Sequence, residues 1–152
     1  MKLDVNEKLR VVIDTQIFLR AVINQRSLPA KIVYDYEDDY ILIVSEATLA
    51  EIEDIISRPK VRKKFEFPEN QISELLIRLA RGERTIVHDI PAISRDSKDD
   101  MILACALSGN AHYIVSEDQD LLVLNTYKEI KIINALDFLR VLESRTQSQT
   151  ED

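Results

Sequence analysis

Five short, largely apolar runs are the feature of this sequence that most constrains its fold, because segments with helical periodicity separate them. The runs are Leu9 to Ile13, Tyr40 to Val44, Thr85 to Val87, Tyr113 to Val115 and Ile130 to Ile133. They are rich in Val, Ile and Tyr and do not alternate with polar residues, as is typical of parallel strands covered on both faces. Strands that alternate with helices are joined by right-handed crossovers. The pattern therefore predicts an α/β fold, a three-layer α/β/α sandwich with a central parallel five-stranded sheet.

The segments between these runs are predicted to be helices. We expect two short helices within 15–36, broken near Pro29, and single helices over 45–57, 68–81, 97–108 and 134–144. Ser45 suits an N-cap, Pro68 a first helical position, and Gly109 with Asn110 the left-handed residue that ends a helix. Because no linker or repeat interrupts the 152 residues, they are expected to form a single domain over 1–152, with a core at about 9–144 and short flexible ends.

Composition excludes several classes of function. The chain has 27 Asp and Glu against 20 Lys and Arg, a net charge of −7, which argues against a general nucleic-acid coat protein because non-specific affinity depends on cations. With two Gly and one Cys, a disulfide scaffold, a Cys-based zinc site and a Gly-rich phosphate loop are excluded. No run approaches the roughly 18 apolar residues of a membrane span, and no signal peptide stands out. We therefore expect a cytoplasmic protein that does not bind membranes.

Acidic residues follow four of the five predicted strands. They are Asp14 after the first, Glu46, Glu51 and Glu53 after the second, Asp96, Asp99 and Asp100 after the third, and Glu117, Asp118 and Asp120 after the fourth. Ligands of open α/β sheets bind at the carboxyl ends of the strands, so these acids are expected to meet at one edge. Two structural alternatives stay open: Asp14 could cap the following helix, and Asp99 could interact with a helix dipole.

Acids gathered in this way require a compensating charge. Two carboxylates about 4 Å apart repel by about 4 kcal/mol at an effective dielectric constant of 20. Three or four would take up protons or bind a cation. Mg²⁺ and Mn²⁺ prefer oxygen ligands and keep several waters, one of which can attack a phosphate ester. The pattern therefore indicates metal-dependent hydrolysis of a phosphate ester.

Four segments, in this order and spacing, resemble the PIN domain: VVIDTQIF, SEATLAEI, RDSKDDMILACA and YIVSEDQDLL. The resemblance extends over about residues 9–140 and is strongest to the branch of toxins from toxin–antitoxin systems. It implies a Rossmann-like sheet and an endoribonuclease that needs Mg²⁺ or Mn²⁺ to hydrolyse RNA phosphodiester bonds. It also implies an RNA substrate, a cognate antitoxin protein and a homodimer. The segments 134–144 and 30–40 are candidates for the dimer face, which the sequence pattern does not locate.

The same resemblance assigns the site residues. The catalytic and metal-binding acids correspond to Asp14, Glu51, Asp99 and Asp118, although periodicity alone does not separate Glu51 from Glu46 and Glu53, or Asp99 from Asp100. The supporting residues are Gln16, Asp96, Asp100, Ser116 and Asp120. Gln16 stands where the family usually has Asn, and Ser116 where it usually has Thr. Each keeps the functional group, so we expect the activity to be retained.

The segment RPKVRKKF contains five cations within seven residues: Arg58, Lys60, Arg62, Lys63 and Lys64. Such a run is either a solvated helix face or a phosphate-binding strip beside the acids. We interpret His88 and His112 as structural or surface residues.

Other functions fit the sequence less well than a nuclease. The main one is a non-catalytic module of the same fold that binds RNA or a protein, favoured only by Gln16. Receiver domains and haloacid-dehalogenase phosphatases fit less well, because the first strand is followed by one acid where they need two.

Overall fold

The computed structural model of the chain describes residues 7–88 and 97–150, so the predicted supporting residue Asp96 lies outside the described residues. A mixed sheet of six strands has the order β3-β2-β1-β4-β6-β5. The strands are β1 (Leu9–Ile13), β2 (Tyr40–Val44), β3 (Glu83–Arg84), β4 (Tyr113–Val115), β5 (Thr126–Tyr127) and β6 (Ile130–Ile133). All neighbouring strands are parallel except β5 and β6, which form an antiparallel hairpin. The α/β/α architecture predicted from the sequence is confirmed.

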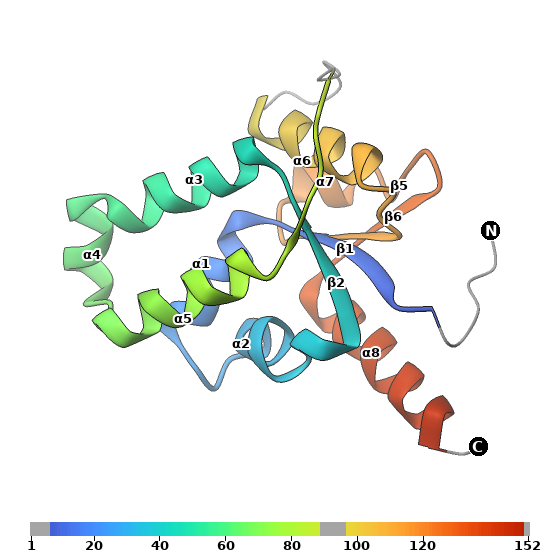
Figure 1. Cartoon of the computed structure of the whole chain (residues 1–152), viewed down its shortest axis with the longest axis horizontal. Coiled ribbons are helices and arrows are strands. Elements are labelled where there is room, and N and C mark those ends of the chain that lie inside the picture. Colours follow the sequence, from blue (N-terminus) through green and yellow to red (C-terminus); the bar gives the residue numbers. More distant parts are fainter. Residues whose placement is uncertain (1–6, 89–96, 151–152) are drawn as a thin grey trace.

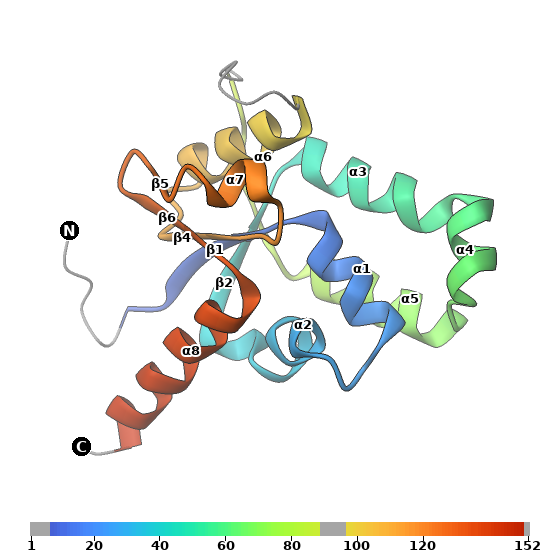
Figure 2. The same ribbon diagram turned by 180° about the vertical axis from the view of Figure 1, so that it is seen from behind.

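Helices cover both faces of the sheet (Figure 1, Figure 2). They are α1 (Thr15–Ile23), α2 (Leu28–Ala30), α3 (Glu46–Ser57), α4 (Pro59–Phe65), α5 (Glu69–Ala80), α6 (Ser97–Ser108), α7 (Gln119–Leu122) and α8 (Ala135–Thr150). A π-helical turn, Lys31–Asp35, and a 3-10 turn, Glu37–Asp39, lead into β2. Successive strand residues point to opposite faces: Val11 packs in the cluster that includes residues of α1 and α8, and Val12 in the cluster that includes α6. The central strands β1, β2 and β4 are therefore buried on both sides, as their apolar runs predict, whereas both residues of β3 are exposed.

Three helices form an arm that extends from the sheet (Figure 1). Helix α3 leaves the carboxyl end of β2, α4 forms the far end, and α5 returns toward β3. Ser45 caps α3 as predicted: its hydroxyl accepts from the Thr48 N–H at 3.2 Å, and the Thr48 hydroxyl accepts from the Ser45 N–H at 2.9 Å. This reciprocal pair satisfies two backbone donors at the helix start.

Four of the five predicted strands have the predicted bounds, and the third is displaced. β3 comprises Glu83–Arg84 and not Thr85 to Val87. The reason is that β2 ends at Val44, which pairs with Arg84, so no residue of β2 is left to pair with the residues after Arg84. Thr85 donates one more hydrogen bond to Val44 O at 2.9 Å, and Ile86 is 77% exposed. The sheet is also not entirely parallel, since the two-residue strand β5 was not predicted.

Several helix details also differ from the predictions. The sequence predicted no separate helix over the residues of α4, only that its basic run could be a solvated helix face. Helix α8 was predicted to end at 144 and continues to Thr150. Pro68 is the N-cap of α5, one residue before the first helical position. After α6 the left-handed residue is Asn110, with φ of 52°, and not Gly109. Glycine is needed at 109 because a Cβ there would lie 2.4 Å from Ile43 Cγ2, where α6 packs on β2.

The segments predicted to offer a dimer face are largely used inside the chain. Phe138 and Leu142 of α8, and Ile32 and Val33 of the π-helical turn, are buried in one core cluster. Leu136 of α8 is 45% exposed. Among the described residues, no helix is long and apolar enough to cross a membrane.

Candidate metal centre

The first acid, Asp14, lies between the end of β1 and the start of α1 and is 8% exposed. It occupies the N-cap position, but its side chain makes no capping hydrogen bond, so the structural alternative of a helix cap is wrong. Instead, the buried Ser116 hydroxyl donates to Asp14 Oδ2 at 2.8 Å. The same hydroxyl accepts from the Asp118 N–H at 3.0 Å. One serine at the end of β4 thus connects the first acid to the fourth acidic segment.

The environment of Asp14 opposes its ionisation. Burial raises the pKa of this carboxyl, the hydrogen bonds from Ser116 and from the Thr15 backbone lower it, and the charges of Glu51 and Asp118 raise it further, with a net upward shift. A carboxyl in this situation gains from a nearby cation, which favours the charged form. Asp14 therefore lies in the electrostatic field of two other predicted site acids.

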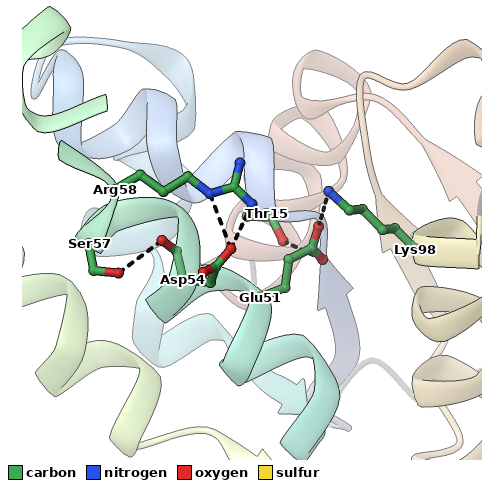
Figure 3. A network of polar contacts seen from close by, with 6 residues as sticks. All are labelled: Thr15, Glu51, Asp54, Ser57, Arg58 and Lys98. Atoms are coloured by element: carbon green, nitrogen blue, oxygen red, sulfur yellow. Dashed lines mark hydrogen bonds and ion pairs between the residues drawn. The ribbon is translucent and has the colours of Figure 1, made fainter. Parts of the chain in front are cut away.

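Glu51 of α3 faces the same edge of the sheet. It accepts a hydrogen bond from Thr15 Oγ1 at 3.2 Å and forms an ion pair with Lys98 Nζ at 3.7 Å (Figure 3). Its side chain is 17% exposed, whereas Glu46 and Glu53 are exposed. The structure thus distinguishes Glu51 from two neighbours that periodicity leaves equivalent. Three segments, at the starts of α1 and α6 and the middle of α3, meet at this carboxylate.

Asp99, Asp118 and Asp120 form the tightest acidic group among the described residues. One carboxylate oxygen from each lies within 4.8 Å of the others. Asp99, in the first turn of α6, is 3% exposed. Asp118 caps α7 and accepts from the Asp120 N–H at 2.9 Å, which fixes the two acids relative to each other. An all-oxygen donor set of this kind fits Mg²⁺ or Mn²⁺.

The predicted residues are therefore not one uniform quartet. Asp99 and Asp118 are joined by Asp120, which was predicted only as a supporting residue, while Asp14 and Glu51 lie beside this group. Asp100 is buried at 6% exposure but is not one of the clustered acids. Gln16 is exposed on the first turn of α1. Thr15 and Lys98 were missed, although each adjoins a predicted acid in the sequence.

Comparison with known proteins identifies the family. The sequence model of the PIN domain matches residues 10–120. The chain belongs to the PIN domain family. This PIN domain is 32% identical over 130 residues to an uncharacterized protein, MJ1680, of Methanocaldococcus jannaschii, across 84% of this chain and 83% of that protein. Its fold is similar to a chain in the crystal structure of VapBC2 from Rickettsia felis bound to a DNA fragment from their promoter. The TM-score is 0.54 at 18% identity, covering 83% of this chain and 98% of that chain.

The basic run of this PIN domain lies in α4, at the far end of the arm and not beside the acids (Figure 1). Arg58 is paired with Asp54 at 2.6 Å (Figure 3). Arg62 Nε donates to Ile56 O at 3.0 Å, and Lys64 Nζ lies 5.2 Å from the centre of the Phe65 ring. Lys60 and Lys63 are exposed. Part of the run thus stabilises the arm itself.

Proposed function

We propose that this PIN domain is an endoribonuclease dependent on Mg²⁺ or Mn²⁺, and the toxin of a toxin–antitoxin pair. The observation that supports it most directly is the convergence of Asp99, Asp118 and Asp120 within 4.8 Å, next to Asp14 and Glu51. Acids from four separate connections repel one another at such proximity, and a bound cation would compensate this repulsion.

The roles of the residues follow from their contacts. Asp99, Asp118 and Asp14 would hold the ion, with Asp120 as a further ligand and Glu51 as an additional acid beside them. The ion, when bound, supplies charge stabilisation to phosphate oxygens and an activated water. Ser116 orients Asp14 through its 2.8 Å hydrogen bond, as groups behind metal ligands commonly do. Thr15 holds Glu51 in the same way.

Lys98 has a distinct role in this proposal. Its ammonium group is 3.7 Å from Glu51 Oε1, and the side chain is 54% exposed. This cation partly compensates Glu51 before an ion binds. It also gives an acidic site one positive charge that can face an incoming phosphate, and so reduces the electrostatic cost of bringing RNA to the acids.

Nuclease assays with purified protein test the proposal. We expect cleavage of single-stranded RNA with Mn²⁺, none with a chelator, and strongly reduced cleavage by Asp99→Asn. The matched control is Asp38→Asn, an exposed acid remote from the site in the turn before β2, which should cleave as the wild type does. Absence of cleavage, together with no heat of Mn²⁺ binding in calorimetry, would instead support the non-catalytic module.

The assignment as a toxin has separate support. The motifs resemble the toxin branch of the family, and the VapBC2 complex has a similar fold. We expect induced expression to arrest bacterial growth, Asp14→Asn to abolish the arrest, and a co-expressed antitoxin to restore growth. The predicted homodimer is tested by sedimentation of the purified protein, in which a particle of one chain, 17.5 kDa, would contradict it.

A further inference from the structure

A hollow lies at the opposite end of the sheet from the acids. Its volume is about 590 Å³, within the range of about 300–1,000 Å³ that is typical of sites for small molecules. Residues near the amino ends of β1, β4 and β6 line it, together with the end of α6 and the turn between β5 and β6 (Figure 1). The acids, in contrast, follow the carboxyl ends of these strands.

The charge of this hollow differs in sign from that of the whole chain. Its lining includes Arg10, Lys128 and Lys131, against one acid, Glu129. Arg10 is already engaged, because its Nε donates to Gly109 O at 2.9 Å and its guanidinium pairs with Glu83. Lys128 and Lys131 are exposed. Neither forms an ion pair among the described residues, although Lys128 Nζ lies 5.8 Å from the centre of the Tyr127 ring, so both can pair with an anion.

His112 adds a neutral donor to the lining. Its Nδ1 accepts a hydrogen bond from the Arg10 N–H at 2.9 Å, which assigns the proton of the neutral ring to Nε2. Burial and the neighbouring charges of Arg10 and Arg145 lower the pKa of His112, opposed by Glu7, so the neutral form is favoured. Within the described parts of the chain, no residue accepts from Nε2. The ring therefore keeps one N–H donor for a ligand.

The floor of the hollow is apolar, and its rim is held in place. Leu107, Ala111, Tyr113 and Ile130 supply the apolar surface. On the rim, Asn110, Lys128 and Glu129 all have left-handed backbone conformations, with φ of 52°, 48° and 68°. Such conformations are uncommon for residues other than glycine and persist where the surrounding structure determines them. Lys128 thus projects from a turn of defined shape, and Lys131 projects from strand β6.

We propose that this hollow binds a nucleotide through its phosphate and base. The phosphate would lie between Lys128 and Lys131, and the base on the apolar floor. The nucleotide can be a free mononucleotide or the phosphorylated end of an RNA strand, since both present the same groups. The proposal does not depend on nuclease activity, because the site shares no residue with the acids.

Calorimetric titration without divalent metal tests this site, with adenosine monophosphate as the probe. We expect saturable binding that Lys128→Glu and Lys131→Glu each weaken by about tenfold, since each removes a charge-assisted contact. Glu129→Gln should strengthen binding, because it removes the one acid. The matched control is Lys31→Glu, an exposed lysine outside the hollow, which should bind like the wild type. Circular dichroism confirms that each variant is folded.

Further binding experiments distinguish a free nucleotide from an RNA end and can overturn the proposal. Binding of a 5′-phosphorylated oligoribonucleotide, but not of its 5′-hydroxyl counterpart, would assign an RNA end, and binding of the mononucleotide alone would assign the free ligand. Asp14→Asn should bind the probe normally, which separates this site from the nuclease. No binding of either probe at millimolar concentration would overturn the proposal, and so would binding by Lys128→Glu and Lys131→Glu that is as tight as that of the wild type.

Discussion

The acidic site at the carboxyl end of the sheet and the hollow at its amino end carry opposite charges, and the helices explain much of the difference. At the carboxyl end, Asp14 and Asp118 occupy the N-cap positions of α1 and α7, and Asp99 lies in the first turn of α6. The positive ends of helix dipoles favour acids at these places. At the amino end, the carbonyl of Gly109, just after α6, accepts from Arg10. A net charge of −7 therefore conceals two sites of different chemistry.

Among the substitutions that test the difference between the two sites, loss of an acid from the carboxyl end of the sheet should have the largest effect. We expect Asp99→Asn to reduce Mn²⁺-dependent RNA cleavage by on the order of 10³-fold, since a metal ligand contributes several kcal/mol to catalysis. Single-turnover assays with labelled RNA measure the rate. Cleavage within a few-fold of the wild type would show that the acidic end is not the nuclease site.

The hydroxyl of Ser116 is the next most sensitive position. Ser116→Ala removes the hydrogen bond to Asp14 and leaves the Asp118 N–H without its acceptor. We expect Mn²⁺ affinity to fall by about 10–100-fold, as for other groups behind metal ligands. Ser116→Thr is the matched control because it keeps the hydroxyl and should keep most of the affinity. Calorimetry measures both, and equal affinities for Ala and Thr would contradict this role.

Lys98 should have a smaller effect of opposite sign. Lys98→Met removes a cation from beside Glu51, and at this exposure the interaction is about 1 kcal/mol, so Mn²⁺ affinity should rise by about fivefold. Lys60→Met, on the distant α4, serves as the control and should leave the affinity unchanged. Weaker metal binding by Lys98→Met would show that the lysine supports the site and does not compete with the ion.

The smallest expected effect concerns the stability of the metal-free protein. Because the folded-state pKa of Asp14 is raised above 3.8, the folded protein keeps this proton to higher pH. The protonated Asp14 carboxyl therefore contributes to the free energy of unfolding at low pH. This contribution is lost as the pH rises through the raised pKa of the folded state. Without metal, Asp14→Asn should therefore unfold at a higher temperature than the wild type at pH 7. Mn²⁺ should raise the melting temperature of the wild type more than that of the variant.

Much of the fold could be predicted because local composition decides it. Leu9–Ile13 and Tyr40–Val44 are strands over the predicted residues, since each is a β-branched run buried on both faces. The third strand was displaced because its extent depends on where β2 ends, which is a property of another segment. β5 escaped prediction because two polar residues in a hairpin carry no such pattern.

The residues of the candidate sites also fall into those that local sequence predicts and those that depend on distant segments. Asp14 and Asp99 could be placed from their positions after strands, whereas the selection of Glu51 depends on Thr15 and Lys98, from two other elements. The hollow at the amino end could not be predicted, because its lysines are separated by more than 100 positions from Arg10 in the sequence. The sequence pattern does not predict which distant segments contact each other.

The edges of the sheet bear on how copies of this chain can associate. The sheet ends on one side in β3 and on the other in β5, each of two residues. So short an edge offers too few unpaired backbone groups to continue the sheet into another chain, a device that protects many proteins from aggregation. We therefore expect two copies that associate to meet through helices or loops and not through a sheet that continues from one chain into the next.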